Sequence, residues 1–391
     1  MQGKNNFDSM ISHENLLHCW YKFTRGKTSR DDVHQYAAHL KANIAIIRHE
    51  LQHQTYVPSP YASFTILYPK KRLINKAVLK DRFVQYVVFD VLTKIYDPSL
   101  ISHAYASRRG KGVHKGVAAL QRMFYQVTHS NKRPCYFLKC DVQKFFDSVN
   151  QDILLAILAK RIGDERFLTL LRTILYSYSS PLSNPLATSD HIGFPIGNVT
   201  SQVFSNIYMN ELDQYVKHVL KMRYYLRYTD DCVFISTSMD QLKECLAKVQ
   251  LFLRERLELT LHPNKITFAH HTQGIDWLGY HMYFSHRLIR TTTKKRIWQR
   301  LQARFVAAYY HQKISFASLQ QTAASYLGIL AHATQYQLSS KISQWIGVKL
   351  STLRRVKGLF FLKKANKVWK KRMQRLASIS KSLKFLHVMP A

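Results

Sequence analysis

The chain has 391 residues, 46% of them hydrophobic, so it can bury the cores of two or three domains. Its 58 Lys and Arg residues face 23 Asp and Glu residues, and a net charge of +35 repels itself unless a polyanion offsets it, which favours a nucleic-acid partner. No apolar run approaches the roughly 18 residues of a membrane-spanning helix, so we expect no membrane partner. The five cysteines include no CxxC pair, so we expect neither a disulfide framework nor a zinc site, and a reducing cytoplasm as the location.

The first third of the chain is predicted to be a helical extension, a strand pair and a long helix. The helical pattern covers the first 55 residues. Residues 61–75, YASFTILYPKKRLIN, are typical of two strands joined around Pro69, and LKDRFVQYVVFDVLTKIY after them is typical of a helix. Residues 135–149, CYFLKCDVQKFFDSV, begin as an apolar strand that ends at Asp141.

Two adjacent carboxylates lie between two predicted strands in YYLRYTDDCVFIS, residues 224–236. Asp230 and Asp231 repel each other and are not the residues that tight hairpin turns prefer. A divalent cation would relieve the repulsion, because hard cations bind carboxylate oxygens. The alternative is a solvated turn, in which Asp is common.

A metal site needs a further ligand, and Asp141 at a strand end is the candidate. The 89 residues between Asp141 and Asp230 leave room for helices before the second strand returns beside the first. Three carboxylates at adjacent strand ends could hold two Mg²⁺ ions and catalyse nucleotidyl transfer. Asp141 could instead cap a helix, and Asp147 is a weaker candidate because it lies farther from the strand end.

The end of the chain contains no carboxylate after Asp276, which predicts contact with a polyanion. Near residues 285–293, FSHRLIRTTT, strand-like sequence gives way to a helical pattern. In that helix the apolar positions are Ile297, Leu301, Phe305 and Ala308, and the basic positions beside them are Arg296, Arg300 and Arg304. A second basic helix is predicted around Ala365, Val368, Trp369 and Leu376, flanked by Lys364, Lys367, Lys371 and Arg375.

Several motifs, in order, resemble those of prokaryotic reverse transcriptases, specifically those of diversity-generating retroelements and related antiviral defence systems. YTDD at 228–231 resembles the YxDD box, and LKCDVQKFFDSV the first catalytic strand. PKKRLI, KDRFVQ and AYASRRGKGVHKG resemble finger motifs, and GFPIGNVTSQVFSNIYMNELD resembles the nucleotide-pocket loop and helix. NK at 264–265 and GIDWLGY at 274–280 resemble the last palm motifs, and SYLGILAHATQ at 325–335 resembles the thumb.

The resemblance implies an α+β, right-hand polymerase fold. Its expected parts are an N-terminal helical extension (1–60), fingers (61–135), a palm with interleaved finger elements (136–285), and a basic helical thumb and tail (286–391). It also implies that Asp141, Asp230 and Asp231 hold two Mg²⁺ ions with the backbone carbonyl of Val142.

The resemblance further assigns binding residues. The nucleotide-binding set is Lys70, Lys71, Arg72, Phe146, Ile196, Gly197, Gln202 and Lys265. The nucleic-acid-binding set is Arg82, Arg108, Trp277, Leu278, Gly279, Tyr280, Arg296, Arg300 and Arg304, of which the last three follow from the basic helix. The alternatives are a buried core position for Phe146, Trp277 and Leu278, and a solvated surface for Lys265 and for Lys70 to Arg72.

Ile196 departs from the Gln that intron and retroviral relatives place in the pocket loop. An apolar residue cannot hydrogen-bond the nucleotide or template, so discrimination there rests on shape. The IGNxTSQ pattern accompanies error-prone copying of template adenines in the resembled group, so we expect similar errors here.

We therefore predict a bacterial, cytoplasmic RNA-directed DNA polymerase that copies a dedicated structured non-coding RNA. The expected partners are that RNA, the RNA/cDNA duplex, dNTPs and a small accessory protein, without a membrane. Two alternatives remain: a noncatalytic RNA-binding scaffold, which explains the charge but not the three aspartates, and a polymerase that makes RNA or adds untemplated nucleotides.

Overall fold

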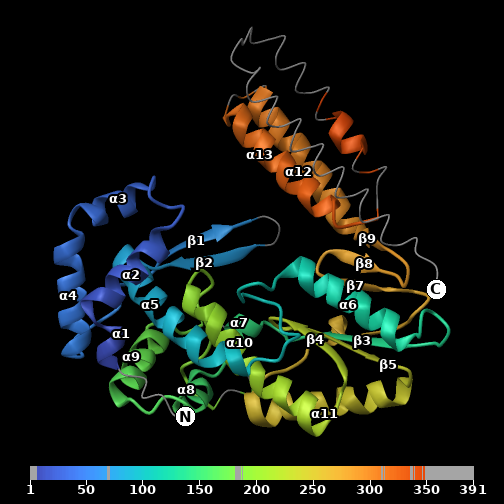
Figure 1. Cartoon of the computed structure of the whole chain (residues 1–391), viewed down its shortest axis with the longest axis horizontal. Helices are drawn as coiled ribbons and strands as arrows, with labels where there is room; N and C mark the ends of the chain where they lie inside the picture. Colours follow the sequence, from blue (N-terminus) through green and yellow to red (C-terminus); the bar gives the residue numbers. More distant parts are fainter. Residues whose placement is uncertain are drawn as a thin grey trace. The chain divides into compact units, whose positions relative to one another are not determined.

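The computed structural model describes residues 7–67, 71–180, 186, 188–309, 311, 313–334, 338, 340–345 and 347 (Figure 1). It combines helices with antiparallel sheets, so the α+β prediction is confirmed. The chain divides into two compact units. Unit 1 comprises Met1–Met123 and Cys135–Phe268, and unit 2 comprises Phe124–Pro134 and Ala269–Ala391.

The described N-terminal residues are helical, as predicted. They form α1 (Phe7–Met10), α2 (His13–Thr24), α3 (Asp31–Ala38) and α4 (Leu40–Gln52). The Ser12 hydroxyl begins α2 by accepting a hydrogen bond from the backbone N–H of Asn15 (3.2 Å), which satisfies one free donor of the first turn. Trp20 and Phe23 of α2 are buried and pack their rings against Phe83, with centroids 5.4 and 5.9 Å away.

The predicted strand pair and long helix are confirmed. Strands β1 (Ala62–Ile66) and β2 (Arg72–Lys76) pair antiparallel, with Phe64 opposite Ile74. Helix α5 (Leu79–Tyr96) follows, then the 3-10 turn Asp97–Ser99 and α6 (Val113–Val127). Every residue of β1 is exposed, so this hairpin projects from the helices instead of contributing to their core.

A four-stranded sheet, in the order β4-β5-β3-β6, positions the carboxylates. Its strands are β3 (Tyr136–Asp141), β4 (Tyr224–Tyr228), β5 (Asp231–Ser236) and β6 (Thr267–His270). The central strand β5 is buried at every position after Asp231, because helices cover the sheet. The two predicted strands around the carboxylate pair are therefore confirmed, although they are more deeply buried than a half-exposed hairpin.

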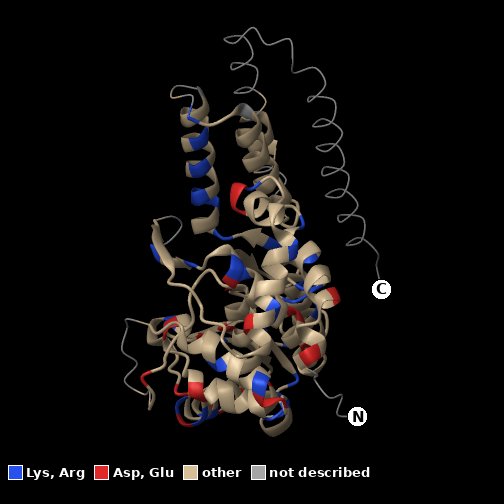
Figure 2. Cartoon of the chain, turned by 90° about the vertical axis from the view of Figure 1, so that its left-hand side faces the viewer, with Lys and Arg blue, Asp and Glu red and all other residues tan. Residues whose placement is uncertain are grey.

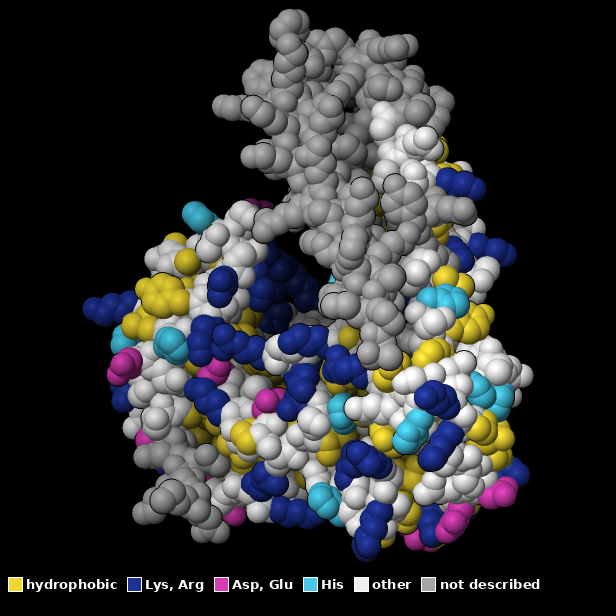
Figure 3. Space-filling model, turned by 45° about the vertical axis from the view of Figure 1, so that its right-hand side comes forward, with side chains coloured by type: hydrophobic (Ala, Val, Ile, Leu, Met, Phe, Trp, Pro, Cys, Tyr) yellow, Lys and Arg dark blue, Asp and Glu magenta, His cyan; other side chains and the backbone are white. Residues whose placement is uncertain are grey.

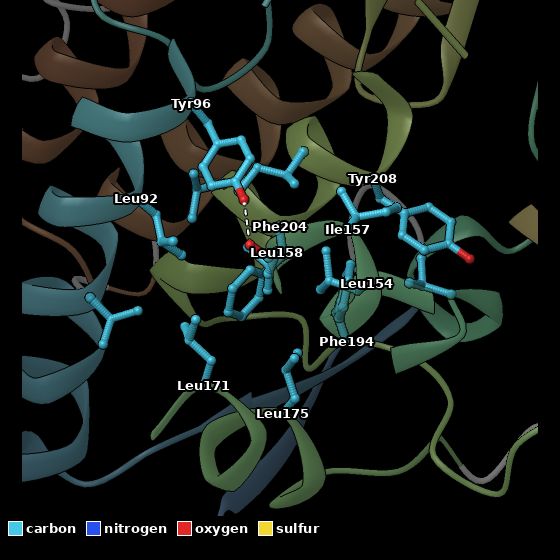
Figure 4. Packing of buried hydrophobic residues seen from close by; sticks show 14 of the residues in the cluster. Leu92, Tyr96, Leu154, Ile157, Leu158, Leu171, Leu175, Phe194, Phe204 and Tyr208 are labelled. Carbon is cyan, nitrogen blue, oxygen red and sulfur yellow. Dashed lines mark hydrogen bonds between the residues drawn. The ribbon is translucent and has the colours of Figure 1, made fainter. Parts of the chain in front are cut away.

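The other helices of unit 1 share one hydrophobic core. They are α7 (Phe145–Ser148), α8 (Gln151–Ala159), α9 (Glu165–Tyr176), α10 (Val199–Gln214) and α11 (Met239–Leu257), with a π-helical segment at Tyr215–Val219 and a 3-10 turn at Pro263–Lys265. Figure 4 shows side chains of α5, α8, α9 and α10 in this core, where the hydroxyl of Tyr96 donates to the carbonyl of Leu158 (3.1 Å). The hydrogen bond removes the cost of burying that hydroxyl.

Unit 2 contains a three-stranded sheet and a helical pair. Strands β7 (Ile275–Trp277), β8 (Tyr280–Met282) and β9 (Arg287–Ile289) precede α12 (Thr291–Tyr309) and α13 (Phe316–Leu330). The apolar face predicted for α12 is buried, and Figure 2 shows Lys and Arg along this helix and no Asp or Glu. The second predicted basic helix, around residues 364–376, lies outside the described residues.

All five cysteines are buried thiols, and none of them forms a disulfide. Among the described helices, none combines the length and the apolar character needed to cross a membrane. The four domain boundaries proposed from the sequence stay a prediction.

Candidate active site

The hairpin of β4 and β5 places Asp230 and Asp231. Tyr228 pairs with Asp231, so Thr229 and Asp230 form a two-residue turn. Thr229 has a φ of +57°, which is unfavourable for a β-branched residue and is found at strained turns. The Arg227 side chain holds this turn, because its Nη1 donates to the Thr229 carbonyl (2.9 Å).

Arg227 itself is anchored by a buried ion pair that we did not predict. Its Nε and Nη2 donate to the two oxygens of Asp213 on α10 (2.8 and 2.7 Å), and both side chains are 0% exposed. The hydroxyl of Tyr225 also donates to Asp213 (2.8 Å), and Arg227 Nη1 is 3.3 Å from Asn206 Oδ1. The only sequence signal was one Arg among the apolar residues of a buried strand.

Asp141 lies at the same sheet edge. In the antiparallel pair β3–β5, Asp141 is directly opposite Asp231, which sets their Cβ atoms about 5 Å apart. The N–H of Val142 donates to the Asp230 carbonyl (3.3 Å). The helix after β3 begins after Lys144, so the alternative in which Asp141 caps that helix is wrong. The structure thus brings Asp141 beside the Asp230–Asp231 pair, which lies 89 residues farther along the chain.

Two lysines partly offset the charge of this carboxylate cluster. Lys265 Nζ lies 2.5 Å from Asp141 Oδ1, and Lys139 Nζ lies 3.5 Å from Asp231 Oδ2. Burial, followed by repulsion from Asp141, raises the pKa of Asp230 to about 6. The pKa of Asp231 is raised to about 7, mainly by burial. The Lys139 ammonium opposes this rise, and the carboxylates of Asp141 and Asp230 add to it. Asp230 and Asp231 are half-buried, and the Asp231 side chain is 19% exposed, which disfavours the fully solvated turn.

The carboxylate cluster fits a divalent cation. Asp231 Oδ1 is buried and has no hydrogen-bond partner in the described part of the chain. Hard cations satisfy such oxygens and remove the mutual repulsion of neighbouring carboxylates. Within the described ranges, no group of three Asp, Glu, His or Cys side chains is already arranged to coordinate a metal ion. Lys139 and Lys265 instead form ion pairs with the carboxylate oxygens that a metal ion would bind. Asp147 lies away from the cluster on α7, where burial raises its pKa.

The predicted pocket loop packs on the β1–β2 hairpin. The carbonyl of Ile196 accepts a hydrogen bond from the N–H of Asn75 (3.0 Å). Gly197 has a φ of +134°, and a Cβ there would lie 2.7 Å from the Asn75 carbonyl oxygen, so only glycine fits. Ile196 is half-buried, whereas Gln202 is exposed on α10.

The other predicted nucleotide-binding residues have different surroundings. Lys71 and Arg72 are exposed at the hairpin, and Lys70 lies outside the described residues. Phe146 is half-buried, with its ring 5.5 Å from that of Phe145, so it is neither a full core residue nor freely exposed. Lys265 is exposed, as its solvated-surface alternative expects, and its Nζ also contacts Asp141.

Three predicted nucleic-acid-binding arginines are engaged within the protein. Arg82 pairs with Asp32 (2.5 Å). Arg108 donates to the carboxylate and carbonyl of Asp97 and to two further carbonyls, and its side chain is only 8% exposed. Arg304 donates to hydroxyls of Ser318 and Thr322 on α13. These contacts argue against a direct nucleic-acid contact for Arg108 and Arg304.

The predicted nucleic-acid-binding segment Trp277–Tyr280 is a tight hairpin. Leu278 and Gly279 both have positive φ (+47° and +87°), which is the conformation of the turns that match strand twist. Trp277 and Tyr280 are buried, and the Tyr280 hydroxyl donates to the carbonyl of Ile329 (3.1 Å). The core alternative therefore holds for Trp277, and only the half-buried turn residues remain accessible. Arg296 and Arg300 lie on α12 outside its buried face.

Comparisons with known proteins indicate the family to which the chain belongs. Residues 68–282 match the family described as reverse transcriptase (RNA-dependent DNA polymerase). The chain is 26% identical over 293 residues to protein YkfC of Escherichia coli K12, covering 66% of this chain and 74% of YkfC. It is 21% identical over 312 residues to the group II intron-encoded protein LtrA of Lactococcus lactis, covering 63% of this chain and half of LtrA.

A solved telomerase from Candida albicans, in complex with a fragment of telomeric RNA, has a similar fold. Its TM-score is 0.50 at 12% identity, and the alignment covers 83% of this chain and 58% of the telomerase. A likeness at this identity supports the right-hand polymerase fold alone. Because the family match includes all three aspartates and more than half of the chain, this protein belongs to the reverse transcriptase (RNA-dependent DNA polymerase) family.

Proposed function

We propose that this reverse transcriptase copies a dedicated structured non-coding RNA into cDNA by two-metal nucleotidyl transfer. The observation that carries the proposal is the register that sets Asp141 opposite Asp231, with Asp230 in the adjoining turn. Asp141, Asp230, Asp231 and the Val142 carbonyl would hold two Mg²⁺ ions. When bound, such ions lower the pKa of an attacking hydroxyl and stabilise a leaving pyrophosphate.

The residues of the chain orient and select the substrates. The Arg227 side chain fixes the turn that carries Asp230. Lys71 and Arg72 supply exposed cations for the triphosphate of an incoming dNTP, since guanidinium matches phosphate oxygens. Phe146, beyond the end of β3, would exclude a ribose 2′-hydroxyl, and Ile196 would leave base selection to shape.

Lys265 Nζ lies 2.5 Å from Asp141 Oδ1, so this side chain would lie near a departing pyrophosphate. Its ammonium replaces part of the positive charge that the carboxylates require when the substrate is absent. We assign it a positioning and proton-donating role that depends on the metal-loaded site.

The biological setting we propose is a diversity-generating retroelement or an antiviral defence system in the bacterial cytoplasm. The partners would be the template RNA, the RNA/cDNA duplex and a small accessory protein. The support is the motif resemblance together with the basic surface, where Lys and Arg are far more frequent than Asp and Glu on the face in Figure 3. Sequencing the RNA that copurifies with the protein, and any cDNA attached to it, would identify the template and its setting.

Primer extension tests the enzymatic proposal. Wild-type protein should extend a primer on RNA with dNTPs and Mg²⁺, and Asp230→Ala should not. Equal extension with rNTPs, or extension without template, would instead support the RNA-making or untemplated alternative. Tight RNA binding without any extension in either protein would support the noncatalytic scaffold.

A further inference from the structure

An aromatic stack lies on the surface of unit 2. Tyr125, at the end of α6, is 55% exposed although it is a large aromatic residue. Its ring is stacked on that of Phe284, with centroids 5.6 Å apart and an interplanar angle of 12°. Phe284 is held edge-on by the buried ring of Phe124 (6.0 Å, 81°). The stack is therefore anchored at its base and open to solvent at Tyr125.

The loop between β8 and β9 contributes a second stacked pair. Tyr283 and His286 have ring centroids 4.8 Å apart at 23°, and the Tyr283 N–H donates to the His286 carbonyl (2.9 Å). Four consecutive residues, 283–286, thus supply three rings to the same surface loop. Aromatic rings at a partly exposed surface are the groups on which unpaired nucleic-acid bases stack.

The loop after α6 brings cations to this stack. Thr128 is buried, and its carbonyl accepts from the N–H groups of Lys132 (2.8 Å) and Arg133 (2.9 Å). Its hydroxyl donates to the Phe124 carbonyl (2.9 Å) and accepts from Asn131 N–H (3.1 Å). The N–H of Ser130 donates to the carbonyl of Tyr125 (3.1 Å), so the loop folds back on the residue that carries the exposed ring.

This loop keeps an unfavourable backbone conformation. His129, Ser130 and Asn131 have φ values of +46°, +61° and +71°, a left-handed run without glycine. Strain of this kind persists where surrounding contacts impose it, and it gathers at binding sites. The result is that His129, Lys132 and Arg133 are all exposed within a few residues of Tyr125.

The charge around the stack suits a polyanion. Residues 113–140 contain no Asp or Glu. The one acidic side chain of unit 2, Asp276, is held by Arg290 Nε (2.8 Å) and His281 Nδ1 (2.7 Å). Cations alone would suit a duplex backbone, but an exposed aromatic stack beside them adds a surface for unpaired bases.

We propose that Tyr125, Phe284 and the basic loop 129–133 form a second RNA-binding site, composed of residues other than those of the active site, that stacks an unpaired base of single-stranded RNA. This inference rests on the proposed function, because it takes RNA as the polyanion of the reverse transcriptase. Tyr125 stacks the base, and Lys132 and Arg133 neutralise the neighbouring phosphates.

The test measures binding of single-stranded RNA by the full chain while the active site is occupied. The protein is first saturated with a short RNA/DNA primer–template hybrid, and a fluorescent, unstructured RNA is then titrated by anisotropy. Tyr125→Ala and Tyr125→Leu should weaken this binding by about tenfold, and Tyr125→Phe should not, since base stacking needs only the ring. For the Lys132→Gln/Arg133→Gln double variant, the slope of the logarithm of the RNA-binding constant against the logarithm of salt concentration should become shallower. The expected change is roughly 0.7 for each phosphate that is no longer neutralised.

Two further measurements separate the outcomes. Photocrosslinking with an RNA that contains 5-iodouridine should label Tyr125 or Phe284, and a label elsewhere only would overturn the site. Binding that is unchanged in Tyr125→Ala, or that is equally weakened in Tyr125→Phe, would also overturn it. Extension of a short primer–template should be retained in all Tyr125 variants. If wild type extends primers but the variants bind RNA normally, this inference alone fails; if wild type extends nothing, the proposed function fails.

Discussion

The two units of the molecule use charge in opposite ways. Unit 1 contains 22 of the 23 Asp and Glu residues and 34 of the 58 Lys and Arg residues, whereas unit 2 contains 24 Lys and Arg and only Asp276. In unit 1, ion pairs such as Arg227–Asp213 and Lys80–Glu50 join distant elements. In unit 2, α12 packs on α13 through the buried Phe305, Ala308 and Leu319 and through hydrogen bonds from Arg304 to Ser318 and Thr322. The Lys and Arg residues of unit 2 therefore far outnumber its acidic partners, which leaves positive charge for a polyanion. The comparison distinguishes charged side chains that stabilise the fold through ion pairs from Lys and Arg side chains that are available to bind a polyanion.

The largest effect should come from the carboxylates that bind metal. Asp141→Asn should lower the rate of primer extension at least about a hundredfold, because bound metal ions stabilise the charge of the transition state by several kcal/mol. Asp147→Asn is the matched control, since Asp147 lies on α7 outside the carboxylate cluster and should retain activity. Equal losses in the two variants would place the metal site elsewhere.

The buried pair of unit 1 should come next. Arg227→Met should cost about 3–5 kcal/mol in the free energy of unfolding, because it leaves the Asp213 charge buried and unpaired. The double variant Arg227→Met/Asp213→Leu should regain much of this stability, measured by denaturant unfolding. It should nevertheless keep a low kcat with a nearly unchanged KM for dNTP, because the Thr229 carbonyl still lacks its donor. Recovery of kcat together with stability would show that Arg227 has no role in positioning the turn.

Magnesium should stabilise unit 1 through the same carboxylates. At a concentration 100 times its Kd, an ion that binds only the folded state adds about 2.7 kcal/mol, which a rise in Tm would report. Asp231→Asn should abolish this rise, and Asp276→Asn, the control in unit 2, should leave it unchanged. A rise that persists in Asp231→Asn would contradict the proposed ligand set.

A smaller effect should separate two arginines of α12. Arg300 is exposed, so Arg300→Gln should reduce the slope of RNA affinity against salt by about 0.7 to 0.9 if this side chain neutralises one phosphate. Arg304 is bonded to Ser318 and Thr322, so Arg304→Gln should lower Tm and leave the slope nearly unchanged. The opposite pattern would mean that Arg304 leaves α13 to contact RNA.

The smallest effect concerns copying errors. The fold should tolerate Ile196→Gln, because the side chain at this position is half-buried and the backbone carbonyl keeps its hydrogen bond from the Asn75 N–H. We expect fewer errors opposite template adenines, measured by sequencing cDNA from both proteins. Equal error spectra would show that Ile196 does not set fidelity.

Local sequence patterns were sufficient for much of this fold. The strand pair at 62–76, the helix 79–96 and the carboxylate hairpin were predictable from the alternation of apolar residues and from turn residues. The buried face of α12 was equally predictable, because Ile297, Leu301 and Phe305 recur at helical spacing. Positions of single charged side chains were less predictable, and Arg108 illustrates why. Its partner Asp97 and three carbonyl contacts depend on how one loop folds, which no periodicity reveals.

The sequence by itself determined that this chain is a basic α+β protein with three aspartates at strand ends, because residue type and spacing act locally. Only the tertiary structure decided that Asp141 lies opposite Asp231, that Arg227 braces the strained Thr229 turn through Asp213, and that Lys139 and Lys265 face the carboxylates. The partners in these contacts are up to 124 residues apart. Burial then strengthens each interaction by excluding water, so the electrostatics of the site arise only when the strands and helices have packed.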